Sequence, residues 1–311
     1  MNPTCLIAMD AGGTKTEAVL FTSEGTVIKR IHTHGINPFN SGFDTACRDC
    51  LDLLAQLKAA SPAPVANAYV GMPASQYFGD TISRHIQAHA GLPLVRTEAD
   101  GYMLISAMLG HQDGAALVCG TGSGLYIRSK GAQYSIGGWG YILDGCGSGF
   151  ILGRRALNAV VRQADGRGEK TLLYGLVRDQ LKAPPEESVP AIYAGGRPFI
   201  ASFAHTVFEA RRAGDGVAAA IFDQNAQALA EMTRAAEPYY AAEFDVVMSG
   251  GIFAAFPEYA EAVTRLGSPR AHMIRADVPP VYGCALENAL ADGPVDEAAF
   301  RARFMADYPG K

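Results

Sequence analysis

The sequence predicts an α/β protein built from two similar halves. Its 311 residues suffice for two domains, and 49% of them are hydrophobic, so large cores can form. Short apolar runs typical of strands alternate with longer runs of helical spacing in the first third of the chain. The pattern then restarts, because Thr4–Thr22 and Ala115–Arg128 each have the form strand, glycine-rich loop, strand. This weak internal repeat suggests two halves that face a shared ligand.

The first half is predicted to contain five strands and three helices. The predicted strands are Thr4–Met9, Glu17–Thr22, Thr26–Thr33, Val65–Val70 and Leu94–Arg96. The predicted helices are Phe43–Ala59, Tyr77–Ala90 and Gly101–Leu109. A Ser-Glu-Gly turn separates the second strand from the third, and Ser61-Pro62 ends the first helix.

The second half begins with two strands and continues with a long helical stretch. The predicted strands Ala115–Cys119 and Leu125–Arg128 flank a glycine loop, and the chain from Phe150 to about Tyr240 is mainly helical. The remaining predicted elements are the strands Phe244–Met248 and Ala271–Ile274 and the helices Pro257–Leu266, Val281–Leu290 and Asp296–Tyr308.

Composition and charge exclude several classes of function. The net charge is -5 and no run of Lys or Arg occurs, so nucleic-acid binding is not expected. No stretch of about 18 apolar residues occurs, so no membrane span is expected. Asp10 interrupts the first apolar run, which is too short for a signal peptide. Six scattered cysteines suit a reducing compartment, so we expect a cytoplasmic protein. Cys47 and Cys50 lack the second pair that a zinc site needs.

Two glycine-rich loops are the strongest chemical signal. Glycines let the backbone turn tightly and present N–H groups to a polyphosphate. A Walker loop is absent, and Gly120-x-Gly122-x-Gly124 runs into a strand rather than opening a Rossmann helix. A glycine-rich hairpin between antiparallel strands fits both loops. Each loop alone could be a plain turn, but the two together favour phosphate binding.

Five short motifs give the chain a family resemblance. They are Asp10-Ala-Gly-Gly-Thr-Lys-Thr16, Gly120-Thr-Gly-Ser123, Gly137-Gly-Trp-Gly140, Ser249-Gly-Gly251 and Gly283-Cys-Ala-Leu286. With them the chain resembles the actin, Hsp70 and sugar-kinase superfamily, and within it the N-acetylglucosamine kinase and BadF/BadG/BcrA/BcrD-type ATPase family. The resemblance implies two ribonuclease-H-like (actin-like ATPase) domains with a central cleft. They would be residues 1–115, closed by C-terminal helices in 285–311, and residues 116–284.

The resemblance also implies an activity. The family includes ATP-dependent kinases that transfer the γ-phosphoryl group to the 6-hydroxyl of N-acetylglucosamine or glucosamine, with ATP and Mg²⁺. The alternative is a BadF-type ATPase that drives a protein partner by domain closure without phosphorylating a small molecule. A small amino sugar is therefore the expected partner, and a homodimer is one candidate for the oligomeric state.

The nucleotide-binding residues follow from the resemblance. Asp10 would orient Mg²⁺ through water, and the residues around ATP would be Gly12, Gly13, Thr14, Thr121, Gly122, Ser249, Gly250 and Gly251. The chemistry at Asp10 agrees, because a carboxylate at a strand end beside exposed N–H groups is unfavourable without a cation. The alternatives are a turn-capping Asp10 and a simple β–α turn at Ser249–Gly251.

Asp100 is the candidate catalytic base. The family has an Asp about twenty residues before Gly-Thr-Gly-Ser, and Asp100 stands at that separation from Gly120. Phosphoryl transfer needs such a group to accept the proton of the attacking hydroxyl. Asp100 could instead cap the helix that starts at Gly101, and a shifted alignment would put Glu98 in the base position.

The resemblance assigns sugar contacts to Asn37, Asp100, Ser123, Gly138, Trp139, Gly140 and Asp144. Asn37 could instead be a turn residue before proline, and Trp139 could be a core anchor. The family continues Gly-Asp-Glu-Gly-Ser after the Trp loop, whereas this chain has Asp144-Gly-Cys-Gly-Ser148. The displaced carboxylate leaves open which amino sugar binds and whether Asp144 reaches it.

Overall fold

The computed structural model describes residues 4–308, which form two compact units. The first unit ends at Gln112 and resumes at Ala276, and the second spans Asp113–Arg275. The sequence placed these boundaries at 115/116 and 284/285. The structure starts the second unit just before the strand β6 (Gly114–Cys119), and a boundary at 284/285 would divide the continuous helix α12 (Pro280–Asp292).

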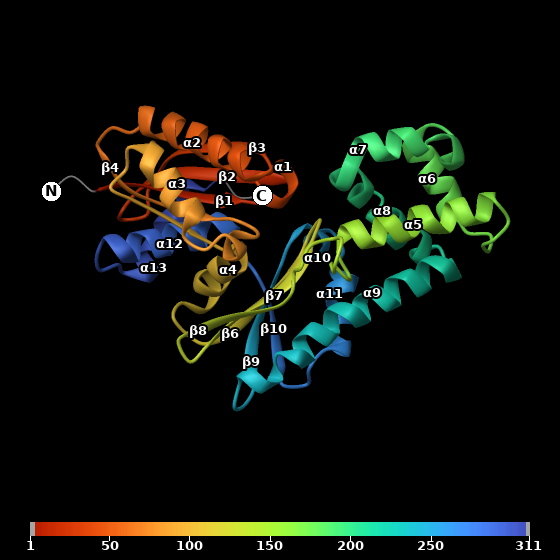
Figure 1. Cartoon of the computed structure of the whole chain (residues 1–311). Coiled ribbons are helices and arrows are strands. Elements are labelled where there is room, and N and C mark those ends of the chain that lie inside the picture. Colours follow the sequence, from red (N-terminus) through yellow and green to blue (C-terminus); the bar gives the residue numbers. More distant parts are fainter. Residues whose placement is uncertain (1–3, 309–311) are drawn as a thin grey trace. The chain divides into compact units, whose positions relative to one another are not determined.

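The first unit contains a five-stranded mixed sheet in the order β3-β2-β1-β4-β5 (Figure 1). The strands are β1 (Cys5–Ala11), β2 (Lys15–Thr22), β3 (Val27–His34), β4 (Val65–Gly71) and β5 (Leu94–Glu98). β1 pairs antiparallel with β2 and parallel with β4. Six of the seven β1 residues are buried, which explains its nearly continuous apolar sequence.

Helices cover both faces of this sheet. They are α1 (Pro38–Ser41), α2 (Phe43–Ala59), α3 (Thr81–Ala90), α4 (Asp100–Leu109), α12 and α13 (Glu297–Asp307), with a 3₁₀ turn at Ser75–Tyr77. α2 and α3 lie on one face, and α12 and α13 lie on the other (Figure 1). The Asn288 side chain of α12 donates to the carbonyl oxygen of Ile7 at 2.8 Å, so the late helix is fixed to the first strand.

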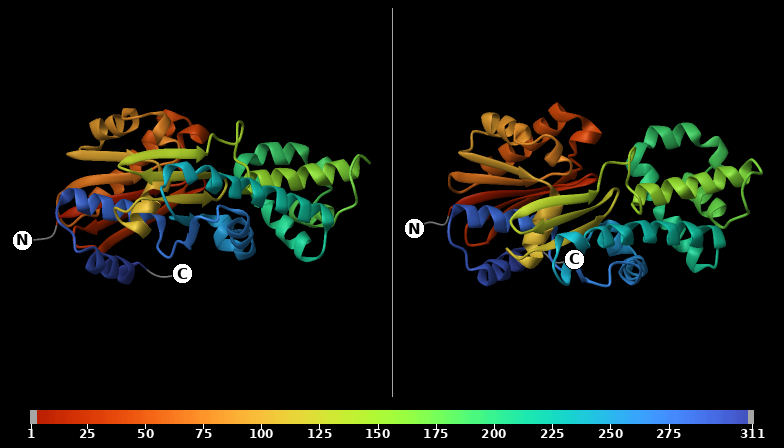
Figure 2. Two further views of the ribbon diagram at one scale, coloured as in Figure 1. Left: turned by 90° about the horizontal axis from the view of Figure 1, so that it is seen from below. Right: turned by 60° about the horizontal axis from the view of Figure 1, so that its bottom comes forward.

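The second unit contains a five-stranded sheet and most of the helices. Its strand order is β10-β9-β6-β7-β8. The strands besides β6 are β7 (Ser123–Ser129), β8 (Ala132–Gly137), β9 (Phe244–Ser249) and β10 (Ala271–Arg275). The helices are α5 (Gly149–Ala164), α6 (Leu173–Leu181), α7 (Val189–Ser202), α8 (Ala204–Arg212), α9 (Gly216–Ala235), α10 (Gly251–Ala255) and α11 (Pro257–Leu266), with 3₁₀ turns at Pro185–Glu187 and Glu237–Tyr239. Figure 2 shows α5 to α8, in green, as one group of helices.

The two sheets repeat one topology. In the first, β3, β2 and β1 form an antiparallel meander, and β4 and β5 follow in parallel beside β1. In the second, β8, β7 and β6 form the meander, and β9 and β10 follow in parallel beside β6. The predicted α/β class and the predicted restart at Ala115 are therefore confirmed.

Three local differences separate prediction and structure. The edge strand β8 was not predicted, because its residues Ala-Gln-Tyr-Ser-Ile-Gly lack apolar alternation. The short helices α1 and α10 were also missed, since four or five residues carry no periodic signal. α3 starts at Thr81 rather than at Tyr77, after Gly79 adopts a φ of 51°. No helix in residues 4–308 combines the length and apolar character needed to cross a bilayer.

Candidate active site

The first predicted phosphate loop is the β1–β2 hairpin. The Gly12 amide donates to the carbonyl oxygen of Lys15 at 3.0 Å, which closes the turn. A side-chain carbon at Gly12 would lie 2.7 Å from that oxygen, so the position tolerates only glycine. The predicted residues Gly12, Gly13 and Thr14 thus share one tight turn at the end of β1.

The segment that carries Asn37 packs directly against this hairpin. A side-chain carbon at Gly35 would lie 2.5 Å from the Thr14 amide nitrogen, and the Ile36 amide donates to the Thr16 hydroxyl at 3.1 Å. Asn37 is buried, and its Oδ1 accepts from the Phe39 amide at 2.9 Å, which caps α1. The turn role of Asn37 is therefore present, and its sugar contact stays a prediction.

Asp10 and Asp100 lie close to each other at the end of β4. Asp10 pairs with Gly71, and a side-chain carbon at Gly71 would lie 3.6 Å from the Asp100 Cα atom. Burial, then the charges of Asp100 and Glu17, raise the pKa of Asp10 to about 7, against the opposing effect of Lys15. Gly71 thus lies between its strand partner Asp10 and the start of α4, where Asp100 stands.

This pair of carboxylates fits a divalent cation. Two like charges in a partly buried site repel each other, and a cation bound beside them relieves that repulsion. Within residues 4–308, no three His, Cys, Asp or Glu side chains gather as a complete metal site. An ion held by Asp10 would therefore take its remaining ligands from water and from substrate phosphate, as Mg²⁺ commonly does.

Asp100 and its rival Glu98 have different surroundings. Glu98 ends β5, and its Oε2 accepts a 2.6 Å hydrogen bond from the hydroxyl of Tyr69, a buried residue of β4. Asp100 is the first residue of α4, follows the cap residue Ala99, and accepts from the Gly101 amide at 3.1 Å. Glu98 thus accepts a hydrogen bond from inside the sheet, whereas the charge of Asp100 acts on Asp10, and the choice of base stays a prediction.

The second predicted phosphate loop is the β6–β7 hairpin. The Gly120 amide donates to Gly122 at 2.8 Å within the loop. The first residues of α5 hold it from outside, since Gly149 donates to the Gly120 oxygen at 2.8 Å and Phe150 donates to the Thr121 oxygen at 3.2 Å. Thr121 and Gly122 therefore lie in a hairpin braced by the start of a 16-residue helix.

Ser249, Gly250 and Gly251 lie beside this loop. They form the predicted turn after a strand, which leads from β9 into the unpredicted helix α10, and β9 runs parallel to β6. Gly250 has a φ of 114°, and a side-chain carbon there would lie 2.3 Å from the Cys119 carbonyl oxygen. Only glycine fits such a position, so the predicted adenosine and phosphate segments are packed backbone to backbone.

The Trp loop continues from β8. Gly138 lies against β7, because a side-chain carbon there would be 3.8 Å from the Ser123 carbonyl oxygen. Trp139 is 54% exposed, so the alternative that it is a core anchor is wrong for the second unit. Asp144 folds back toward β8, with Oδ2 3.1 Å from a side-chain carbon placed at Gly137. Ser123, Gly138 and Asp144 therefore gather around one strand end.

The loop that follows Asp144 is fixed by Ser123 and by two residues that the sequence analysis did not identify. The Ser123 hydroxyl donates to the Cys146 oxygen at 2.7 Å. The Gly147 amide donates to Asn225 Oδ1 at 3.1 Å, and the Gly147 oxygen accepts from the Tyr259 hydroxyl at 2.9 Å. Asn225 and Tyr259 lie 78 and 112 residues away in sequence, so only the fold reveals them.

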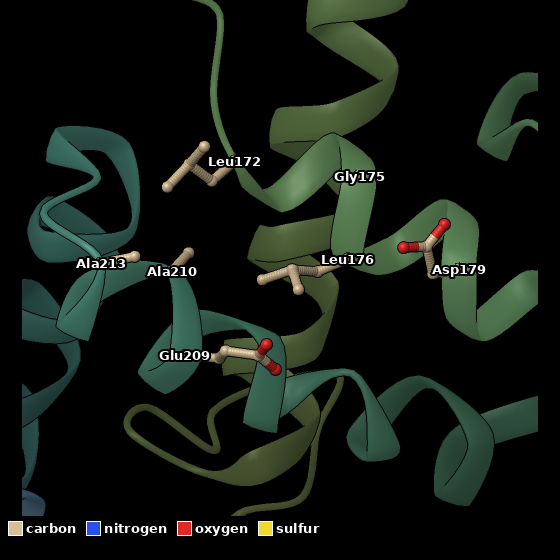
Figure 3. Close-up of a pocket in the computed structure, with 7 residues that line it drawn as sticks. All are labelled: Leu172, Gly175, Leu176, Asp179, Glu209, Ala210 and Ala213. Atoms are coloured by element: carbon tan, nitrogen blue, oxygen red, sulfur yellow. The ribbon is translucent and has the colours of Figure 1, made fainter.

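A surface hollow of about 240 Å³ lies away from these loops, among α6 and α8 (Figure 3). Its lining residues are Leu172, Gly175, Leu176, Asp179, Glu209, Ala210 and Ala213. None of them is a predicted site residue.

Comparisons with known proteins agree with the geometry. The profile of the BadF/BadG/BcrA/BcrD ATPase family matches residues 7–287. The N-acetylmuramic acid/N-acetylglucosamine kinase of Clostridium acetobutylicum is 28% identical over 236 residues, which cover 72% of this chain and 76% of the relative. The glucosamine kinase GspK of Vibrio cholerae is 25% identical over 211 residues, which cover 64% and 71%.

A solved structure resembles most of the chain. A candidate N-acetylglucosamine kinase from Chromobacterium violaceum aligns with a TM-score of 0.74 and 24% identity, covering 91% of this chain and 98% of that protein. Together with the repeated sheet topology, this similarity confirms the predicted fold of two actin-like ATPase domains.

Proposed function

Because the chain belongs to the BadF/BadG/BcrA/BcrD ATPase family, we propose that it is an ATP-dependent sugar kinase. The reaction is transfer of the γ-phosphoryl group of ATP to the 6-hydroxyl of N-acetylglucosamine or glucosamine, with ADP as the second product. Two relatives are named for kinases of these amino sugars, which supports the substrate class.

The observation that carries the proposal is the closeness of Asp10 and Asp100 at the end of β4. Phosphoryl transfer needs an ion near the phosphates and a base at the attacking hydroxyl, and two adjacent carboxylates can divide these roles. Asp10 would hold Mg²⁺, which neutralises phosphate charge when bound. Asp100 would accept the proton of the sugar hydroxyl while the hydroxyl oxygen attacks the γ-phosphorus of ATP.

The glycine loops supply the nucleotide contacts of this proposal. Gly12, Gly13 and Thr14 of the first unit would bind phosphate through backbone amides. Thr121 and Gly122 would do the same from the second unit. Ser249, Gly250 and Gly251 would border the adenosine, since they are packed against the base of the second loop.

The sugar contacts of the proposal are Asn37, Ser123, Gly138, Trp139, Gly140 and Asp144. An exposed tryptophan flanked by glycines suits close approach of a sugar ring. Ser123 uses its hydroxyl hydrogen for Cys146, so toward a ligand it offers only its oxygen as an acceptor. Asp144 would supply a carboxylate that accepts from sugar hydroxyls.

A second candidate function is an ATPase that drives a protein partner. The displaced carboxylate at Asp144 and the engaged Ser123 hydroxyl favour it, because both weaken the resemblance to the family's sugar pocket. This function needs the nucleotide residues but not Asn37 or Trp139.

Release of ADP with MgATP tests both candidates. The panel is N-acetylglucosamine, glucosamine, N-acetylmuramic acid, N-acetylmannosamine, glucose and no sugar. A kinase releases ADP only with an accepted amino sugar and forms one sugar phosphate per ADP. ADP release at the same rate with and without each sugar would instead support the ATPase function. Light scattering of the same samples tests the proposed homodimer, and cell fractionation tests the proposed cytoplasmic location.

A further inference from the structure

The geometry points to Arg197 as a phosphate-binding residue contributed by the helical part of the second unit. Its guanidinium would contact the polyphosphate of the nucleotide held at the Gly120–Gly122 loop. The inference rests on the proposed function, since it takes ATP to be the molecule bound there.

Arg197 lies over the second glycine loop. A side-chain carbon placed at Gly122 would be 3.0 Å from Arg197 Nη2. The guanidinium therefore occupies the space that any residue other than glycine would fill at position 122. Glycine at position 122 has two effects: it exposes the backbone of the loop, and it leaves room for the guanidinium beside it.

Aromatic contacts orient the guanidinium. Arg197 lies over the Tyr141 ring, with its Cζ atom 4.9 Å from the ring centroid. Tyr141 packs edge-on against Phe150 at 5.1 Å, and the Phe150 amide donates to the Thr121 oxygen. One chain of contacts thus joins Arg197, the Trp loop and the phosphate loop, which fixes the cation near the backbone.

The backbone of α7 also aims Arg197. Gly196 interrupts this helix with a φ of 62° and a ψ of -160°, and Pro198 follows Arg197. The residue between them therefore begins a new helical segment. The break sets the direction of the Arg197 side chain independently of the preceding turn, and α7 belongs to the helix group seen in Figure 2.

The charge environment favours an anion at this position. Burial lowers the pKa of Arg197, while a guanidinium stays charged in proteins. A partly desolvated cation gains most when an anion binds beside it. The planar fork of arginine matches the oxygen geometry of phosphate, so a nucleotide polyphosphate is the fitting ligand.

The test measures calorimetric affinities for adenosine, ADP and a non-hydrolysable ATP analogue with Mg²⁺. We expect Arg197→Gln to weaken binding of the analogue by about 10- to 100-fold, as loss of a charged hydrogen bond does, with adenosine affinity unchanged. Arg197→Lys should recover part of the loss, because it keeps the charge but not the fork. If Arg197→Gln does not fold, the affinity of Arg197→Lys for the analogue is the measurement that tests the inference.

Arg211→Gln is the matched control, because Arg211 also lies over an aromatic ring, that of Phe222 at 3.9 Å. It should leave the affinity for the analogue unchanged. Equal weakening of adenosine and analogue in Arg197→Gln would show a structural role and overturn the inference, as would unchanged binding of the analogue. A wild-type protein that binds no adenine nucleotide would instead overturn the proposed function itself.

Discussion

Replacement of Asp10 by asparagine should stabilise the metal-free protein, and increasingly so as the pH rises. The pKa of Asp10 is raised from 3.8 to about 7 in the folded state. A raised carboxyl pKa means that the folded state binds the proton more tightly than the unfolded state. The stability contribution of this proton is present below pH 3.8 and is lost as the pH rises to about 7.

The size of the effect follows from that shift. Between about pH 5 and pH 8 the ionised Asp10 should cost the wild-type fold about 2.5 kcal/mol more, at 1.36 kcal/mol per pKa unit. Asp10→Asn removes this pH-dependent cost. Its stability advantage over the wild type should therefore grow by about that amount across the same pH interval.

Urea unfolding in the presence of EDTA measures this difference. Asp52→Asn is the matched control, since Asp52 is an exposed carboxylate of α2 in the same unit. The control should show no such growth with pH. An equal stability difference between Asp10→Asn and wild type at both pH values would refute the reasoning. With Mg²⁺ and ATP present, the order should reverse, because only the wild type holds the ion.

Four further predictions concern the candidate site. Asp100→Asn should lower kcat by about 10²- to 10⁴-fold with ATP affinity unchanged, and near-wild-type turnover would remove Asp100 from the base role. Glu98→Gln should instead lower the unfolding free energy by about 1–2 kcal/mol, because Tyr69 loses a charged acceptor, and it should keep turnover. A loss of turnover as large as that of Asp100→Asn would make Glu98 the base. Trp139 emission should change with saturating amino sugar, and constant emission would contradict a ligand role for this exposed ring. Tyr259→Phe should raise the sugar KM more than the ATP KM, because the Gly147 oxygen loses a donor; equal changes would point to general destabilisation.

The sequence predicts the sheets well because their signals are local. β1 and β6 are short apolar runs that end at glycine loops, so strand, turn and following strand are visible within about twenty residues. β8 is not predicted because its own residues carry no strand pattern. It becomes a strand by pairing at the edge of the folded sheet. The parallel partners of β1 and β6 follow only from their order in the fold.

The candidate site is predictable in its glycines and not in its supports. Gly12 and Gly250 are identifiable because backbone crowding at both positions admits no side chain. The requirement for glycine is therefore visible in the sequence itself. Asn225 and Arg197 come from the long helical region, whose residues approach the loops only after folding. Ser123 matches the motif as a ligand, yet its hydroxyl donates to the protein itself. A motif fixes which residue occurs, while the fold decides which partner it takes.

The late helix α12 has a consequence for synthesis on the ribosome. It packs on β1, where Asn288 bonds Ile7, and against α4, where a side-chain carbon at Gly283 would lie 2.0 Å from the Met103 oxygen. At about 5–20 residues per second, the first strands wait tens of seconds for this helix to emerge. The inserted unit Asp113–Arg275 is complete before then, so the segment translated second should be the first to reach its final structure.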